Sequence, residues 1–212
     1  MRDYNFIWDL DGTLIDSYDV IVGALVEISK ETGHPAEFDK VLDTVKKYTV
    51  GKFMSDMQRE YTVDVSYCVR RYQEITAENL HKIKLIDGVR DTLSALKNSG
   101  CRSFVYTHRD ESTFPILRNN RIIDFFEDII TIDKSLRPKP CPDGINLIID
   151  RFCLSREKTF YVGDRTIDID AGENAGVRTI LYLPEDSPVE PKGNENYTVK
   201  NITEILNLPG LF

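Results

Sequence analysis

Residues 5–14 read NFIWDLDGTL, an apolar run that leads directly into two carboxylates and a glycine. The first five residues predict a buried parallel strand, because such strands stay apolar until they reach the edge of their sheet. Asp9 and Asp11 lie two residues apart, so on an extended chain they point the same way and repel each other unless positive charge or a shared proton lies between them. The stretch therefore predicts a charged site at a strand end.

The composition predicts a globular protein with one large core, or a core with a smaller partner domain. The chain has 212 residues, of which 41% are hydrophobic and 29% charged, and a formal net charge of −8. That charge argues against nucleic acid as a partner, because sequence-independent binding needs clustered Lys and Arg. No run approaches a membrane span, and the first residues carry acids where a signal peptide would be apolar. The four scattered cysteines lack metal-ligand spacing and predict a reduced, cytoplasmic protein.

Helical periodicity predicts an all-helical block over residues 16–85. Apolar residues recur at helical spacing after Ser17, and again along two stripes that begin at Phe38 and Val65. The block contains no convincing strand. It is expected to form a separate helical domain.

Outside this block, strands alternate with helices. Beyond the first strand, short β-rich runs occupy residues 103–107, 128–131, 159–162 and 178–182. This alternation predicts an α/β fold, a doubly wound parallel sheet with crossover helices. The core is expected to comprise residues 1–15 and 86–212, with the helical block inserted after its first strand. The Pro-, Gly- and Glu-rich residues 184–196 are expected to form a loop.

Polar residues follow several of the predicted strands, at the sheet edge where doubly wound folds place their sites. Besides the first two acids, they are Thr107, Lys139, Asp164 and Asp168. Carboxylates gathered at one edge repel by about a few kcal/mol per close pair, so they imply a hard divalent cation, of which Mg²⁺ fits best. The positive charge of Lys139 fits an anion.

These residues resemble the motifs of the haloacid dehalogenase superfamily of phosphohydrolases, in its branch with a helical cap after the first strand. Asp9-Leu10-Asp11-Gly12-Thr13 looks like the first motif, Thr107 the second, Lys139 the third, and Gly163-Asp164 through Asp168 the fourth. All stand in family order at strand ends, and the resemblance covers the whole chain. It implies a Rossmann-like core, and phosphoglycolate-phosphatase-like proteins are the most similar members.

The resemblance implies a role for each motif residue. Asp9 would be the nucleophile that forms an aspartyl-phosphate, and Asp11 the general acid and then the base. Thr107 and Lys139 would hold the phosphoryl oxygens. Mg²⁺ would be held by the Asp9 carboxylate, the Asp11 backbone carbonyl and Asp164, with Asp168 bound through water or orienting the other ligands.

Other residues near the motifs have less specific signals. Gly12 would allow a tight turn, and backbone N–H groups there would assist phosphoryl binding. His108 and Arg109 follow Thr107 of the second motif. Relatives often have Asn at the position of His108, which reads either as a substrate contact or as a packed loop histidine. Residues 48–52 resemble a cap loop that faces the site, so Lys52 reads either as a substrate contact or as a surface lysine.

Each motif residue also has a structural reading. The first two acids, or Asp164 and Asp168, would then only cap helices, and Lys139 would be a solvated lysine between prolines. Asp87 stands where relatives often have Pro, at a predicted hinge before Gly88.

The leading function is a Mg²⁺-dependent phosphatase that acts on a small phosphorylated metabolite. A phosphosugar mutase like β-phosphoglucomutase uses the same acids and differs only in its product. A dehalogenase would not need Asp11 or the metal acids. A phospho-accepting receiver domain is a binding module with similar residues, but it brings its acids before Thr and Lys and has no helical insert. The sequence does not indicate an oligomeric state.

Overall fold

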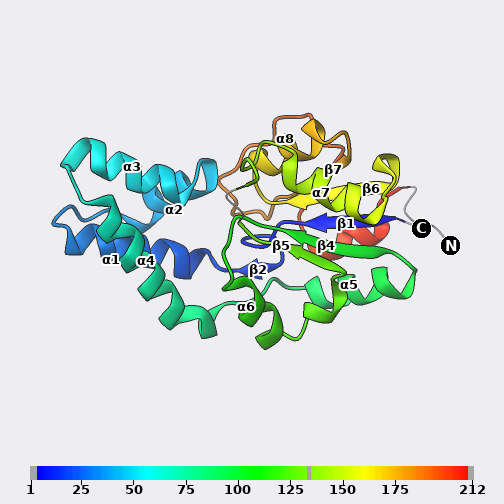
Figure 1. The fold of residues 1–212 in the computed structure, drawn as a ribbon, viewed down its shortest axis with the longest axis horizontal. Helices are drawn as coiled ribbons and strands as arrows, with labels where there is room; N and C mark the ends of the chain where they lie inside the picture. The colour runs from blue at the N-terminus through cyan, green and yellow to red at the C-terminus, as the bar shows by residue number, and fades with distance from the viewer. Residues whose placement is uncertain (1–3, 133–134, 210–212) are drawn as a thin grey trace. The chain divides into compact units, whose positions relative to one another are not determined.

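The computed structural model describes residues 4–132 and 135–209 and divides into two compact units (Figure 1). The core unit comprises Met1–Asp16 and Leu85–Phe212, and the helical unit comprises Ser17–Lys84. The sequence patterns predict boundaries one residue away, between residues 15 and 16 and between residues 85 and 86. In the described ranges, no helix is both long and apolar enough to cross a membrane.

The described part of the core unit contains a six-stranded parallel sheet in the order β5-β4-β1-β6-β7-β8. The strands are β1 (Asn5–Trp8), β4 (Arg102–Tyr106), β5 (Asp128–Ile130), β6 (Thr159–Gly163), β7 (Arg178–Tyr182) and β8 (Tyr197–Val199). Because β1 lies between β4 and β6, the chain winds outward from it in both directions. The predicted doubly wound sheet is confirmed, and ligands bind such sheets beyond the carboxyl ends of the strands at this switch point.

Helices pack on the sheet and bury its side chains. They are α5 (Val89–Asn98), α6 (Thr113–Asn119), α7 (Asp143–Phe152) and α8 (Thr166–Asn174), with short 3₁₀ turns η2 (Ile123–Phe125), η3 (Arg156–Lys158) and η4 (Ile202–Asn207). One apolar cluster joins Ile7, Phe104 and Tyr161 of the sheet to Ile145 on α7 and Ala171 on α8. In sequence, Ile7 alternates with Phe6 and Trp8, and the Phe6 ring stacks on both Trp8 and Phe160. Both faces of β1 are therefore buried, as its continuous apolar run predicts.

The helical unit consists of four α-helices and one 3₁₀ turn among its described residues. They are α1 (Tyr18–Glu31), α2 (Phe38–Lys47), α3 (Val50–Tyr61), α4 (Val65–Asn79) and η1 (Leu80–Lys82). Apolar side chains of these helices form a second cluster that includes Leu25, Ile28, Val41 and Cys68. At the two crossings between units, β2 (Ile15–Asp16) pairs with β3 (Lys84–Leu85).

The structure differs from the sequence patterns in three places. Strand β8 begins just after the segment predicted as a loop, and its three residues are too short to give an alternating pattern. Strands β2 and β3 have two residues each and were not predicted for the same reason. Gly51 and Lys52 lie in the first turn of α3, capped by the Thr49 side chain, rather than in a loop.

Two glycines give a test of this packing. A Cβ at Gly172 on α8 would lie 2.5 Å from Thr179 Cγ2 and 3.2 Å from Tyr161 Cβ, so Gly172→Ala should destabilise the core unit by about 1–3 kcal/mol. A Cβ at Gly23 on α1 would meet nothing within 4 Å, so Gly23→Ala should stabilise its helix by about 0.5–1 kcal/mol. Chemical denaturation checks both, with the fluorescence of the single tryptophan, Trp8, reporting on the core unit and circular dichroism on the helices. Equal effects of the two substitutions would contradict the close approach of α8 to the sheet.

Candidate active site

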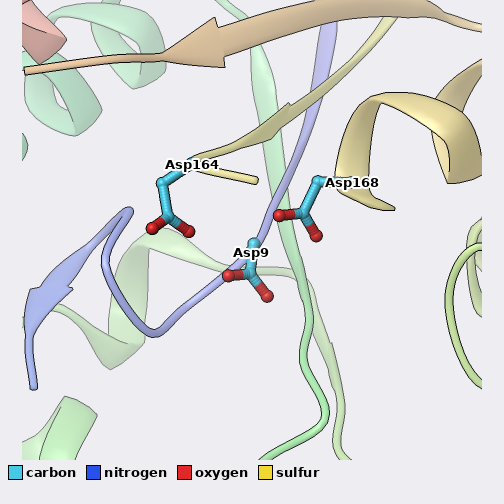
Figure 2. Close-up of side chains that lie close together, drawn as sticks. All are labelled: Asp9, Asp164 and Asp168. Atoms are coloured by element: carbon cyan, nitrogen blue, oxygen red, sulfur yellow. The ribbon is translucent and has the colours of Figure 1, made fainter. Parts of the chain in front are cut away.

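Three carboxylates converge at the carboxyl edge of the sheet (Figure 2). Asp9 directly follows β1, Asp164 directly follows β6, and Asp168 lies in the first turn of α8. Their carboxylate oxygens lie within 4.8 Å of one another, and all three residues are buried. Figure 2 shows the side chains of Asp164 and Asp168 reaching toward Asp9 from its two sides. Asp9 stands there because strand β1 ends beside β6.

Lys139 supplies positive charge to this cluster. Its side chain is fully buried, and Nζ donates hydrogen bonds to Asp9 Oδ1 and, at 2.8 Å, to Asp168 Oδ1. The ammonium also lies 5.2 Å and 5.4 Å from the ring centroids of Tyr106 and Tyr161, within the range of cation–π attraction. The structure therefore does not match the reading of Lys139 as a solvated lysine. Sequence reasoning did not single out the two tyrosines, because buried aromatic residues on strands read simply as core.

The pKa directions follow from this shared charge. Burial raises the pKa of Asp9 to about 6, and the nearby Asp168 adds to the rise against the lowering by Lys139. Burial also acts to raise the pKa of Asp168, but Lys139 and Arg165 hold it below its usual range. For Lys139, burial acts to lower the pKa, and the two carboxylates outweigh it and raise the pKa above its ordinary value. Of these two carboxylates, Asp9 is thus the one whose charge is less compensated.

The cluster fits a hard divalent cation. Asp9 Oδ2 is buried and accepts no hydrogen bond from any residue that the structure describes. Two carboxylates 4.8 Å apart repel by about 3 kcal/mol at an effective dielectric of 20. Carboxylate oxygens are the ligands that Mg²⁺ prefers. An uncompensated buried oxygen among three acids is the feature that such an ion would satisfy.

Asp168 has a structural role as well. Its Oδ2 accepts the backbone N–H of Arg165 at 3.2 Å, which completes a capping box at the start of α8. The capping reading and the site reading therefore both describe this residue. Arg165 Nε lies 3.8 Å from the same oxygen. The sequence analysis did not single out Arg165, although it is a basic residue inside the fourth motif.

Thr107 and His108 follow β4 beside the cluster. Thr107 is buried, and its Oγ1 accepts the backbone N–H of Arg109 at 3.0 Å, which directs its own O–H hydrogen elsewhere. His108 Nε2 accepts the backbone N–H of Lys139 at 2.9 Å. The ring therefore links the end of β4 to the loop that carries the lysine.

Asp11 does not join the three buried acids. Both of its carboxylate oxygens accept hydrogen bonds from Arg109, at 3.1 Å from Nε and 2.5 Å from Nη2. The side chains of Arg109 and Asp11 are 8% and 20% exposed. Sequence reasoning noted a guanidinium near the site but did not predict this pairing. Four gathered carboxylates were expected, and three form the cluster while the fourth has its own cation.

Gly12 and Lys52 have local partners. Gly12 adopts a positive φ of 78°, and its N–H donates to the Ile15 carbonyl at 2.9 Å, so its observed role is the turn. Lys52 forms an ion pair with Asp56 one turn along α3. The structure brings Lys52 into contact with residues of the helical unit.

The chain is similar to known proteins along most of its length. The family model described as "Haloacid dehalogenase-like hydrolase" matches residues 6–182. A phosphoglycolate phosphatase of Aquifex aeolicus is 32% identical over 186 residues, covering 84% of this chain and 83% of the relative. The pyrophosphatase PpaX of Halalkalibacterium halodurans is 25% identical over 212 residues, covering 97% and 96%. A crystal structure of a predicted phosphoglycolate phosphatase from Haemophilus somnus shares the fold, with a TM-score of 0.84, 22% identity and 98% of each chain covered.

The hydrogen bond from Lys139 fixes the protonation state of His108. Burial and the charge of Lys139 lower the pKa of His108 to about 3, so the ring is neutral at any pH above that value. Because Nε2 accepts, the proton lies on Nδ1. Nitrogen-15 NMR of histidine-labelled protein should show this tautomer unchanged from pH 5 to 8, with His108→Asn identifying the signal. A titration midpoint near the ordinary value of about 6.5 would contradict the buried hydrogen bond.

Proposed function

The chain belongs to the haloacid dehalogenase-like hydrolase family, and from this premise we propose that it is a Mg²⁺-dependent phosphatase of a small organic phosphomonoester. The family relationship inferred from the motifs is confirmed. The observation that carries the proposal is the buried Lys139, which contacts Asp9 and Asp168, while Asp9 Oδ2 accepts no hydrogen bond from the described residues. Asp9 Oδ2 is therefore available to a cation or to a phosphoryl group, and the positive charge of Lys139 lies beside it. The scattered cysteines support a cytoplasmic setting for this activity.

In the first half of the reaction, a carboxylate oxygen of Asp9 attacks phosphorus. The bond between phosphorus and the leaving oxygen breaks, and that oxygen takes a proton from Asp11, so the alcohol departs and an aspartyl-phosphate remains. Lys139 and the Thr107 hydroxyl stabilise the phosphoryl oxygens. This division replaces one difficult displacement with two easier ones.

In the second half, water attacks the same phosphorus. Asp11 takes a proton from this water, the bond between phosphorus and Asp9 breaks, and inorganic phosphate leaves. Both carboxyl groups then stand in their starting states. A Mg²⁺ ion held by Asp9, Asp164, Asp168 and the Asp11 carbonyl would neutralise phosphoryl charge throughout.

The helical unit is proposed as the cap of this enzyme. The chain enters the helical unit after β2 and returns to the core unit at β3. An insertion of helices after the first strand is the pattern of the family that the sequence resembles. A cap that closes would exclude water during the first transfer, and one that opens would release product. If Lys52 contacts the substrate, it does so as a residue of this cap.

Pyrophosphate is a second candidate substrate. The H. halodurans relative that matches nearly the whole chain is named a pyrophosphatase. A phosphosugar mutase would use the same residues and is separated by its product, because a mutase returns the phosphoryl group to a sugar. The family membership disfavours a receiver-type binding module.

Replacing the nucleophile tests the proposal directly. Asp9→Asn has nearly the same shape but a poor nucleophile, so phosphate release should fall to background. The assay is a phosphate-release screen over small phosphorylated metabolites and pyrophosphate, with Trp8 fluorescence as the check on folding. A folded Asp9→Asn protein that keeps wild-type turnover would falsify the assignment.

Metal dependence is tested by a second variant. Chelation should abolish activity and Mg²⁺ should restore it, while Asp164→Ala should raise the Mg²⁺ concentration for half-maximal activity by about tenfold or more, since it removes one ligand of the cluster. The control is Asp150→Ala, which removes the same charge from the exposed end of α7. Activity that survives exhaustive chelation, or equal metal titrations for both variants, would argue against a cation at the three acids.

A further inference from the structure

Arg109 is bound to the residue that must act as general acid. Its guanidinium donates to both oxygens of Asp11, and Nη1 lies 3.4 Å from Ser112 Oγ. Its backbone is fixed at the end of β4, because its N–H donates to Thr107 Oγ1 and its carbonyl accepts the N–H of Ile132 at 3.0 Å. The guanidinium therefore has a defined place in the core unit, next to the phosphoryl site.

This pairing leaves Asp11 engaged. A carboxylate whose two oxygens accept from one guanidinium fork is held in a single orientation. To reach the leaving oxygen it must break this bidentate pair, whose guanidinium is only 8% exposed. Separating such a pair is costly unless another anion takes the vacated place.

We propose that Arg109 binds an anionic group carried by the leaving group of the substrate, and that this group replaces Asp11 on the guanidinium and frees Asp11 to take up a proton from solvent and act as the general acid. The inference rests on the proposed phosphatase function and narrows its substrate class. A carboxylate or phosphate matches the planar fork in the same bidentate way as Asp11 does. A neutral leaving group offers no such exchange.

The names of the relatives point in the same direction. Phosphoglycolate carries a carboxylate on its leaving group, and in pyrophosphate the leaving group is itself a phosphate. The two compounds differ in size and chemistry but share an anion close to the scissile bond. Lys52 is the other cation considered for this role, and it already pairs with Asp56 on its own helix.

The kinetic test compares matched substrates. 2-Phosphoglycolate and pyrophosphate represent the two sources of the anion, and 2-phosphoglycolamide replaces the carboxylate by a neutral amide of the same shape. Arg109→Gln should lower kcat/KM for whichever anionic substrate the wild type prefers by about a hundredfold, and should change phosphoglycolamide by less than about fivefold. Arg109→Lys should recover part of the loss. Arg118→Gln, on the exposed side of α6, controls for the lost charge.

Equal losses on the anionic and neutral substrates would show that Arg109 only positions Asp11 and would overturn the inference. If Lys52→Ala, rather than Arg109→Gln, lowers kcat/KM selectively for the anionic substrates, the anion is bound by the helical unit and the inference is overturned as well. If the wild type releases phosphate in a Mg²⁺- and Asp9-dependent manner while either result holds, the proposed function stands and only the inference fails.

A binding measurement decides the inference even without turnover. 3-Phosphonopropanoate and propylphosphonate are non-hydrolysable and differ chiefly in a terminal carboxylate. In calorimetry with Mg²⁺ present, wild-type protein should bind the carboxylate compound at least about tenfold more tightly, and Arg109→Gln should bind the two alike. Wild-type protein that binds both equally, or neither, would overturn the role of Arg109.

Discussion

The buried ammonium of Lys139 holds two buried carboxylates, and the remaining features of the site depend on this contact. Each charge taken out of water alone would cost several kcal/mol, so Asp9 and Asp168 are stable there because Nζ donates to both. The lysine in turn is fixed by the rings of Tyr106 and Tyr161 and by the hydrogen bond from its backbone to His108. The result is a carboxylate at the end of β1 with one oxygen compensated and the other open to a cation.

The fold brings together groups from four separate parts of the sequence, around residues 9, 107, 139 and 164–168. Asp9, Thr107 and Asp164 follow three adjacent strands of a parallel sheet, so their side chains meet at one edge. The close approach of α8 to the sheet at Gly172 brings Asp168 to the same point. Chain order and strand order together therefore explain why motifs scattered over some 160 residues form one site.

The sheet and the three-acid cluster could largely be predicted from the sequence. The apolar run of β1 leads directly into the acidic motif, and most later strands are short apolar runs separated by helical segments. Strand β8 could not be predicted, since three residues paired only along one edge carry no pattern. The pairing of Arg109 with Asp11 was also out of reach, because it joins residues 98 positions apart whose meeting depends on β4 lying beside β1. The roles of Tyr106 and Tyr161 were hidden for a related reason. Burial on a strand looks the same whether a ring packs against apolar residues or against an ammonium.

The central claim is that Asp9 carries the phosphoryl group during the reaction. The most direct measurement mixes enzyme, Mg²⁺ and a hydrolysed substrate for a few milliseconds, quenches in acid, and reduces the acyl phosphate with borohydride before peptide mapping. An aspartyl-phosphate is reduced to homoserine, so the account predicts homoserine at position 9 in a peptide that spans residues 5–14, with Asp11 unchanged. An unmodified Asp9 under conditions of active turnover, or homoserine at position 11 or 164, would contradict it.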